Sequence, residues 1–186
     1  MVTVGVLALQ GGVREHQELI ESLGARAIAV KKESQLHDLD ALIIPGGEST
    51  TISKLIDAFD LKQPIAALIA SNIPVLATCA GLILLAEEVD GKPGFFKNLP
   101  IKVTRNAYGA QLASAEAVVD YQDGSENAAF IRAPKILDFG NSEVIGRVAD
   151  EVVAIKFGNI IGASYHPELT NSTMLHRKLL ELTASN

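Results

Sequence analysis

The sequence predicts an α/β fold: a mostly parallel central sheet with flanking helices, to which a region of short antiparallel strands is appended. In the first half of the chain, short β-branched apolar runs alternate with helical patterns, which is typical of a parallel, doubly wound sheet. After residue 88 the apolar runs are short and separated by turn residues, which is typical of antiparallel strands. With 186 residues, 48% of them hydrophobic, the chain is long enough for one well-buried domain, and we expect a single domain over residues 1–186.

The alternation begins at the N-terminus. An apolar run closed by Gln10-Gly11-Gly12 is followed by a helical apolar stripe, which Gly24 ends. We expect Ser49 or Thr50 to cap the helix after the third strand, because both side chains can accept a hydrogen bond from a free backbone N–H group. The expected strands are 2–9, 25–30, 41–44 and 75–77, and the expected helices are 13–23, 52–59, 61–71 and 82–87.

The second half of the chain adds shorter elements. Residues 90–94 predict a turn and residues 105–109 a loop. A strand at 160–165 should end beside the first strands, and a helix should close the chain. The expected elements are a strand at 101–104, antiparallel strands at 115–121, 129–132, 135–139, 144–148 and 151–156, the strand at 160–165 and a helix at 174–182.

Composition excludes several classes of function. The chain has 16 basic and 22 acidic residues, a formal net charge of -6, and so no electrostatic footprint for nucleic acid or an anionic membrane surface. No apolar stretch reaches the roughly 18 to 20 residues of a membrane span, and no basic region precedes the first strand, as a signal peptide requires. The one cysteine excludes an internal disulfide and suits a reducing compartment, so we expect a cytoplasmic protein.

The only cysteine, Cys79, lies between an expected strand and an expected helix. A nucleophile at such an elbow has a strained backbone, and the helix must approach the strand closely, so small neighbours are needed. Ala77, Ala80 and Gly81 are small. A thiol at a helix N-terminus is favoured as thiolate, and free N–H groups there can bind an oxyanion. The alternative is that Cys79 is a small buried apolar residue.

A partner for Cys79 follows the expected strand at 160–165. A nearby imidazole that accepts the thiol proton and later protonates a leaving group would make Cys79 an effective nucleophile, and His166 is the candidate. Pro167 favours an extended backbone at His166, so Glu168 could orient the ring from the same side of the segment. The carboxyl ends of parallel strands share one sheet edge, which would bring Cys79 and His166 together.

Two glycine turns also follow strands at this edge. Gly46 and Gly47 leave backbone N–H groups accessible, and Gly47 could supply a second oxyanion donor beside Ala80. The Gln10-Gly11-Gly12 turn follows the first strand in the same way. Neither turn has a phosphate-binding pattern, and Glu48 would repel an anion. For each turn, the alternative is a tight turn without a ligand.

Other charged residues have weaker indications. Arg105 and Arg132 each follow a short apolar run, where a guanidinium can bind a carboxylate through two hydrogen bonds; a solvated surface arginine is the alternative. His16, His37 and His176 have no metal-ligand spacing with cysteine or carboxylates. We therefore expect no metal site and assign these three histidines to the surface.

Six blocks of the sequence together resemble one enzyme family. In order and spacing they are similar to the glutaminase subunits of pyridoxal 5'-phosphate synthase, the PdxT family, which are class I (triad) glutamine amidotransferases with a flavodoxin-like fold. The resemblance runs from the first expected strand to the last helix. The blocks are 7–12 (LALQGG), 43–51 (IIPGGESTT), 78–85 (TCAGLILL), 105–109 (RNAYG), 130–134 (FIRAP) and 164–170 (SYHPELT).

The resemblance implies a reaction and its residues. Cys79 would attack the carboxamide carbon of L-glutamine, His166 would transfer the proton, and Glu168 would orient His166. Ammonia would leave, and water would release glutamate from a glutamyl thioester, with no cofactor. Backbone N–H groups of Gly47 and Ala80 would bind the oxyanion. The residues implied to bind glutamine are Gly46, Gly47, Glu48, Arg105, Ile131 and Arg132, with Glu48 at the ammonium group and one of the two arginines at the carboxylate.

The resemblance also implies a partner. Relatives dock on a synthase subunit that combines the ammonia with ribose 5-phosphate and glyceraldehyde 3-phosphate, in an assembly with twelve copies of each subunit. Gln10, beside the expected oxyanion turn, is a candidate for the residue through which docking activates the enzyme.

Two residues depart from the family pattern. Ala77 stands where relatives usually have glycine; it adds one methyl group near the strained turn, which we expect the fold to tolerate. Ala110 stands where we expect arginine; the loss of this charge affects the strength of docking and not the hydrolysis.

Three other functions compete with this one. A glutaminase for another synthase, such as the histidine-pathway amidotransferase, fits blocks 7–12 and 105–109 less well. A silent scaffolding subunit would not need Cys79, His166 and Glu168. A cysteine hydrolase of the related peptidase-like α/β group would keep them. Electrophile labelling of Cys79 separates the silent subunit and the peptidase-like hydrolase from a glutaminase, because glutamine should protect the thiol only in a glutaminase.

Overall fold

The computed structural model describes residues 1–105 and 114–184 of the chain. Its helices are α1 (Val13–Ser22), α2 (Ser49–Ala58), α3 (Lys62–Ala70), α4 (Ala80–Leu85) and α5 (Met174–Ala184), with short 3-10 helices at Glu33–Gln35 (η1) and Pro167–Leu169 (η2). Its strands are β1 (Thr3–Leu7), β2 (Arg26–Val30), β3 (Ala41–Ile44), β4 (Val75–Thr78), β5 (Ala86–Val89), β6 (Lys92–Pro93), β7 (Leu99–Thr104), β8 (Ser114–Tyr121), β9 (Gly124–Ile131), β10 (Lys135–Asp138), β11 (Glu143–Val148), β12 (Glu151–Phe157) and β13 (Ile160–Ala163).

In this part of the chain, the strands form two sheets. The main sheet has nine strands in the order β2-β1-β3-β4-β13-β12-β11-β8-β9, and a smaller sheet has four in the order β10-β7-β5-β6. Neighbouring strands from β2 to β13 are parallel, whereas those from β13 to β9 are antiparallel. The predicted parallel core with an appended antiparallel region is therefore confirmed.

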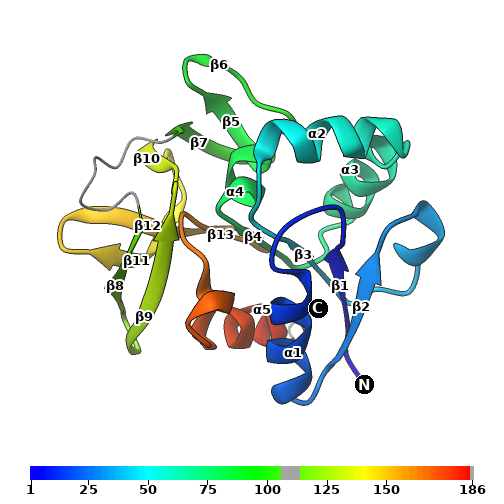
Figure 1. Cartoon of the computed structure of the whole chain (residues 1–186), viewed down its shortest axis with the longest axis horizontal. Coiled ribbons are helices and arrows are strands. Elements are labelled where there is room, and N and C mark those ends of the chain that lie inside the picture. Colours follow the sequence, from blue (N-terminus) through cyan, green and yellow to red (C-terminus); the bar gives the residue numbers. More distant parts are fainter. Residues whose placement is uncertain (106–113, 185–186) are drawn as a thin grey trace.

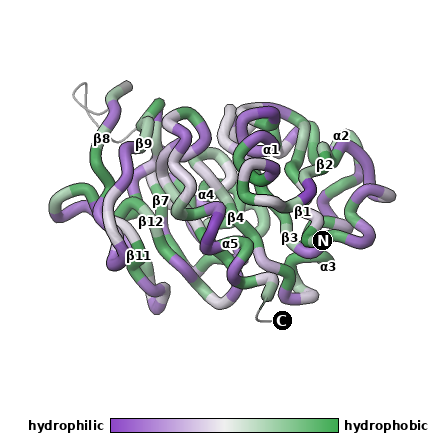
Figure 2. Tube along the Cα trace, turned by 90° about the horizontal axis from the view of Figure 1, so that it is seen from below, coloured by the Kyte–Doolittle hydropathy of each residue, from purple (hydrophilic) through white to green (hydrophobic). Residues whose placement is uncertain are grey.

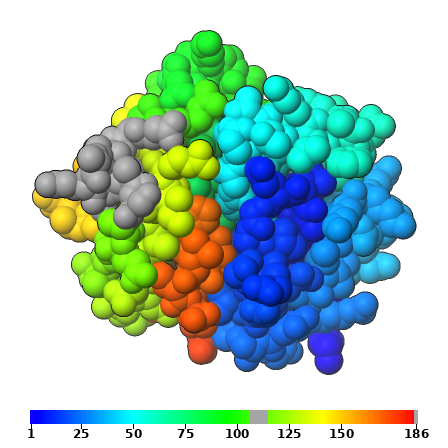
Figure 3. All heavy atoms as spheres, viewed as in Figure 1, coloured from blue at the N-terminus to red at the C-terminus, as the bar shows by residue number. Residues whose placement is uncertain are grey.

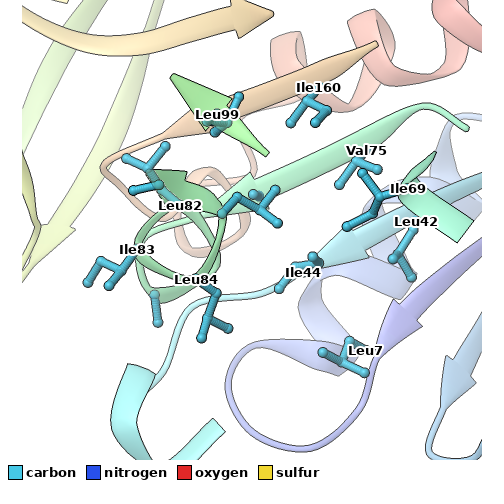
Figure 4. Packing of buried hydrophobic residues seen from close by; sticks show 14 of the residues in the cluster. Leu7, Leu42, Ile44, Ile69, Val75, Leu82, Ile83, Leu84, Leu99 and Ile160 are labelled. Carbon is cyan, nitrogen blue, oxygen red and sulfur yellow. The ribbon is translucent and has the colours of Figure 1, made fainter. Parts of the chain in front are cut away.

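Helices cover both faces of the parallel strands (Figure 1). Ile52 of α2 and Ile65 of α3 pack in one buried cluster with α4, and Ile20 of α1 and Leu175 of α5 pack in a second cluster on the other face. Hydrophobic residues gather along the central strands in Figure 2. In Figure 4, Leu82 of the short helix α4 lies near Leu99 of β7, and Leu84 lies on the side of Ile44 of β3. Burial on both faces explains why these strands read as continuous apolar runs.

Several elements differ from their predictions. Helix α2 begins at Ser49, and the carboxylate of Glu48 accepts hydrogen bonds from the backbone N–H groups of Thr50 and Thr51, so the predicted cap at Ser49 or Thr50 was wrong. Helix α4 ends at Leu85, where the backbone becomes extended to enter β5. Strand β10 pairs with β7 in the smaller sheet instead of extending the main one. That second sheet was not predicted.

The predicted strand at 75–77 carries one departure from the family pattern, Ala77. It is fully buried in β4 and pairs in register with Ile44 of β3 and Gly162 of β13. Among the helices that the structure describes, none is long and apolar enough to cross a membrane.

Candidate active site

Segments that are far apart in the sequence converge on one face of the molecule, as the mixture of colours in Figure 3 shows. Strands β4 and β13 are parallel neighbours, with Thr78 paired to Ala163 at their carboxyl ends. The backbone N–H of Cys79 donates to the carbonyl of Ala163 over 2.8 Å. Cys79 and His166, which follow these two strands, therefore lie at the same sheet edge.

The backbone at Cys79 is strained. Its φ of 49° and ψ of -102° are outside the regions that L-residues usually adopt, and its side chain is almost completely buried. Such a conformation costs on the order of 1–3 kcal/mol and occurs mostly at functional sites. A Cβ atom at Gly81 would lie 2.1 Å from the carbonyl oxygen of Ile44, so the close approach of α4 to β3 requires glycine there. The strained elbow with small neighbours is confirmed.

His166 lies between Cys79 and Glu168. Its Nδ1 atom is 2.8 Å from Oε1 of Glu168, whose side chain is completely buried. The backbone N–H of His166 donates to the carbonyl of Ala129 over 2.8 Å, which ties the segment to β9. Burial by itself would lower the pKa of His166, but the hydrogen bonds that the protonated ring donates to the sulfur of Cys79 and to Glu168 outweigh it and raise the pKa to about 10. His166 therefore carries a proton at neutral pH.

The backbone around this pair differs from the extended segment that we expected. The 3-10 helix η2 begins at Pro167, and Glu168 lies within it. This turn still directs the carboxylate to Nδ1 of His166. A Cβ atom at Gly12 would lie 2.9 Å from Cγ of Glu168, so the glycine turn after β1 leaves the space that this carboxylate occupies.

Two of the three histidines assigned to the surface are buried. His16 on α1 and His176 on α5 are both fully buried, with His16 Nδ1 2.8 Å from His176 Nε2, and only His37 is exposed as predicted. His16 Nε2 also lies 3.4 Å from Oε2 of Glu168. Helical periodicity could have predicted the burial of His16, because it precedes the buried residues Leu19 and Ile20 by three and four positions and so lies on the same face of the helix.

The second glycine turn touches the same site. A Cβ atom at Gly46 would lie 2.2 Å from Cε1 of His166, so only glycine leaves room for the imidazole ring. Gly47 has a φ of 141°, which favours glycine. The side-chain Oε1 of Gln10 accepts a hydrogen bond from the backbone N–H of Glu48 over 2.7 Å and so holds this turn against the loop after β1.

The carboxylate of Glu48 is occupied by helix α2. Its two oxygens accept four hydrogen bonds, from the N–H and hydroxyl groups of Thr50 and Thr51. The two hydroxyl hydrogen bonds, together with those of the backbone, lower the pKa of Glu48 to about 2. An ionised carboxylate has about four acceptor positions, so Glu48 keeps its negative charge but has none free for a further donor.

A cavity of about 190 Å³ opens beside Cys79. It brings together most of the residues named from the sequence; Ser49 and Ile83 also line it and were not predicted. Gln10, Gly46, Ala80 and Glu168 are not part of its wall. The lining residues are Gly47, Glu48, Ser49, Cys79, Ile83, Arg105, Ile131, Arg132 and His166.

The two arginines in this cavity differ in their surroundings. Arg105 donates from Nε to Oδ2 of Asp90 over 2.7 Å, and its backbone and side-chain hydrogen bonds lower the pKa of Asp90. Arg132 has a φ of 47° and forms no ion pair within the described parts of the chain. Residues 106–109 of the predicted loop, and Ala110, lie outside the described residues.

Residues 6–183 match the SNO glutamine amidotransferase family. The chain belongs to this family. It is 47% identical over 189 residues to a pyridoxal 5'-phosphate synthase subunit PdxT from Parafrankia sp., an alignment that covers 98% of this chain and 93% of that protein. It is also 47% identical over 171 residues to a subunit of the same name from Staphylococcus haemolyticus, covering 90% of this chain and 91% of that one.

Solved structures of other proteins have the same fold as this chain. A crystal structure of a glutamine amidotransferase superposes with a TM-score of 0.90 at 41% identity, covering 97% of this chain and 98% of that one. A structure of PurLQS from Thermotoga maritima superposes with a TM-score of 0.71 at 15% identity, covering 97% of both chains, which shows the fold alone. The predicted amidotransferase-like α/β fold is confirmed.

Proposed function

We propose that this chain is the glutaminase subunit of a pyridoxal 5'-phosphate synthase, a single amidotransferase domain that hydrolyses L-glutamine and supplies ammonia for vitamin B6 synthesis. The observation that carries this proposal is the alignment of Cys79, His166 and Glu168 beside a cavity that contains both acidic and basic side chains. The full-length similarity to PdxT subunits supports the pathway.

The proposed reaction begins with the sulfur of Cys79. It attacks the carboxamide carbon of glutamine, and the carbonyl oxygen becomes an oxyanion. His166, which is protonated at neutral pH, donates its proton to the departing ammonia, and a glutamyl thioester remains. His166 then accepts a proton from water as it attacks the thioester, so glutamate is released, the sulfur of Cys79 leaves as the thiolate with which the reaction began, and His166 is protonated again. Glu168 holds Nδ1–H of His166 throughout.

Backbone groups are proposed to stabilise the oxyanion. Ala80 is the first residue of α4, so its N–H group has no partner within the helix. Gly47 lies in the turn on the other side of Cys79, and its positive φ turns its peptide group in a way that other residues rarely adopt. Two N–H donors at this position would contribute about 2.7–4 kcal/mol each to transition-state stabilisation.

The ends of glutamine are proposed to bind to the charged wall. Because Arg105 is paired with Asp90 and Arg132 is not paired with an acidic residue in the described parts of the chain, we assign the substrate carboxylate to Arg132. Glu48 would attract the ammonium group by its charge alone, since its acceptor positions are filled by Thr50 and Thr51. Gly46 and Ile131 would complete the site through backbone groups.

The partner is proposed from the relatives. They are named as subunits of pyridoxal 5'-phosphate synthase, so we propose a complex with a synthase subunit, in twelve copies of each, located in the cytoplasm. Gln10 holds the backbone of Glu48, next to the proposed oxyanion donor Gly47. Docking that moves Gln10 would therefore alter the oxyanion site. Replacing Gln10 with alanine should reduce partner-stimulated turnover, and unchanged turnover would reject this role.

The test is ammonia release from L-glutamine by the purified chain, alone and with a pyridoxal 5'-phosphate synthase subunit, with Cys79→Ala as the control. The proposal requires that ammonia release increases when the synthase subunit is added and that it disappears in Cys79→Ala. Release that the partner does not change would reassign the pathway to another synthase. No release under either condition, together with labelling of Cys79 that glutamine does not prevent, would reject the glutaminase.

A further inference from the structure

A pair of buried histidines lies directly behind the proposed catalytic residues. His16 and His176 come from α1 and α5, which pack on the same face of the main sheet, and their ring centroids are 5.1 Å apart. Neither side chain lines the cavity beside Cys79. The proposed reaction does not use them, yet two polar rings in an apolar interior are costly unless their hydrogen bonds are satisfied.

The pair meets the proposed catalytic residues at Glu168. One carboxylate oxygen, Oε1, is 2.8 Å from Nδ1 of His166. The other, Oε2, is completely buried and forms no regular hydrogen bond within the described residues, but Nε2 of His16 is 3.4 Å away. An unsatisfied oxygen on a buried carboxylate destabilises its charged form, and a small movement of either side chain would make Nε2 its donor.

The protonation states of His16 and His176 restrict the hydrogen bonds that the two rings can form. Burial lowers the pKa of His16, and the nearby His176 and His166 lower it further; burial also lowers the pKa of His176, to about 4. Both rings are therefore neutral at neutral pH, with one N–H group each. If His16 carries its hydrogen on Nε2, it presents a donor to Oε2 of Glu168 and to the hydroxyl oxygen of Thr78, which also lies 3.4 Å from Nε2. Its Nδ1 is then an acceptor toward Nε2 of His176 at 2.8 Å. The opposite tautomer would direct a lone pair at the carboxylate.

We propose that His16 is a positioning residue for Glu168 and that it directs its Nε2–H at Oε2. The inference rests on the proposed function. With both oxygens of Glu168 held, the carboxylate keeps one orientation, and Oε1 remains on His166. Among the described residues, no group of three or more His, Cys, Asp and Glu side chains could hold a metal ion.

A matched pair of variants tests this role. The amide nitrogen of His16→Gln can occupy the position of Nε2 and still donate to Oε2, whereas His16→Asn is one bond shorter and cannot reach it. We expect His16→Asn to lower kcat about 10-fold or more with KM nearly unchanged. His16→Gln should recover most of that loss. Ile20→Val is the control for packing, because Ile20 is buried on the same helix and belongs to no described catalytic contact.

The pH profile separates positioning from folding. Without a donor on Oε2, Glu168 should hold the proton of His166 less firmly and raise the pKa of His166 less, so the alkaline limb of kcat should move to lower pH in His16→Asn and not in His16→Gln or Ile20→Val. The titratable groups around Glu168 are His166 on its own segment, His16 on α1, and His176 behind it on α5. Glu15 and Glu18 of α1 share a surface cavity with Glu168 and are unchanged in every variant.

A second readout does not depend on glutamine. The rate of Cys79 alkylation by iodoacetamide, followed from pH 5 to 9, should show the same shift in His16→Asn. If the wild type fails to hydrolyse glutamine with the synthase subunit, the proposed function is wrong, but this profile still tests His16. Equal profiles for the Asn and Gln variants would overturn the inference. Should His16→Asn fail to fold, His16→Leu, which removes the donor to Oε2 and keeps an apolar side chain, must give a shift in the same direction; an unshifted profile would also overturn the inference.

Discussion

The buried wall of the proposed active site, which consists of Cys79, His166, Glu168 and the residues packed behind them, and its exposed wall are held in different ways. Cys79, His166 and Glu168 follow or terminate elements of the parallel core, and the carboxylate of Glu168 is fully enclosed. The opposite wall contains Arg105, whose side chain is 40% exposed, and Arg132, which is also exposed. The groups proposed to react are thus fixed by packing, and the charged groups proposed to bind glutamine are fixed by a few polar contacts. Changes to the first wall should affect kcat, and changes to the second should affect KM.

The largest effect should come from crowding the buried wall. In Gly46→Ala, the new methyl group would overlap Cε1 of His166, which must move away from Cys79. We expect kcat to fall by at least about 100-fold, comparable to the loss of one catalytic hydrogen bond. Gly91→Ala is the control, because Gly91 lies in open space and its substitution adds only the strain of a positive φ. A kcat within threefold of the wild type in Gly46→Ala would contradict the rigid wall.

The next effect is on acid stability, and it also belongs to the buried wall. An unfolded histidine binds a proton below about pH 6.5. Folded His176 resists protonation until the pH is near its pKa of about 4, so the unfolded chain binds more protons between these values. The free energy of unfolding should therefore decrease from pH 6.5 to 4, by about 1.4 kcal/mol per unit of pKa difference. Urea unfolding across this range measures it.

The matched control for acid stability is a histidine outside the core. His176→Phe should flatten the decrease, whereas His37→Asn, at an exposed position, should leave it unchanged. The same decrease in both variants would show that His176 is not its source.

A smaller effect should come from the exposed wall. Removing a charged hydrogen-bond partner of the substrate carboxylate costs about 1.5–3 kcal/mol, so Arg132→Ala should raise KM roughly 10- to 100-fold with little change in kcat. Arg105→Ala should raise KM less, because Asp90 already engages that guanidinium. Steady-state kinetics with L-glutamine measure both. If Arg105→Ala gives the larger change, the assignment of the carboxylate is reversed.

The smallest effect concerns the turn that joins the two walls. Glu48→Gln removes the charge from the cap of α2 and should lower the free energy of unfolding by about 1 kcal/mol, or about 2–4 °C in Tm. Because the pKa of Glu48 is lowered to about 2, the cap's contribution is present above pH 4.5 and is lost as the pH falls toward 2. Solvent screening reduces this contribution at such an accessible carboxylate. Calorimetry at pH 7 and pH 3 should show the difference between the two proteins shrinking.

Sequence patterns predicted the parallel core well, because strands buried on both faces leave continuous apolar runs. They did not predict the smaller sheet, since nothing local indicates that Lys135–Asp138 pairs with Leu99–Thr104. The predicted cap of α2 was wrong because Glu48, Ser49 and Thr50 can all accept hydrogen bonds from backbone N–H groups, and the sequence does not show which of them precedes the first turn. The burial of His16 could have been predicted from its spacing to Leu19 and Ile20, but its contact with His176, 160 residues away, is contained in no local pattern. Glycine turns and strand ends indicated most of the cavity residues and the resemblance added Ile131, whereas Ser49 and Ile83 were missed; the catalytic roles remain predictions.

The position of β13 in the main sheet has a consequence for protein synthesis. This strand is last in the chain but lies between β4 and β12, and its end residue Ala163 accepts the hydrogen bond from Cys79. A nascent chain that has reached residue 159 therefore contains Cys79 but lacks β13, the strand that joins the parallel and antiparallel parts of the main sheet. The hydrolytic site cannot assemble on the ribosome until the C-terminal segment has emerged, and premature termination yields a chain without this activity.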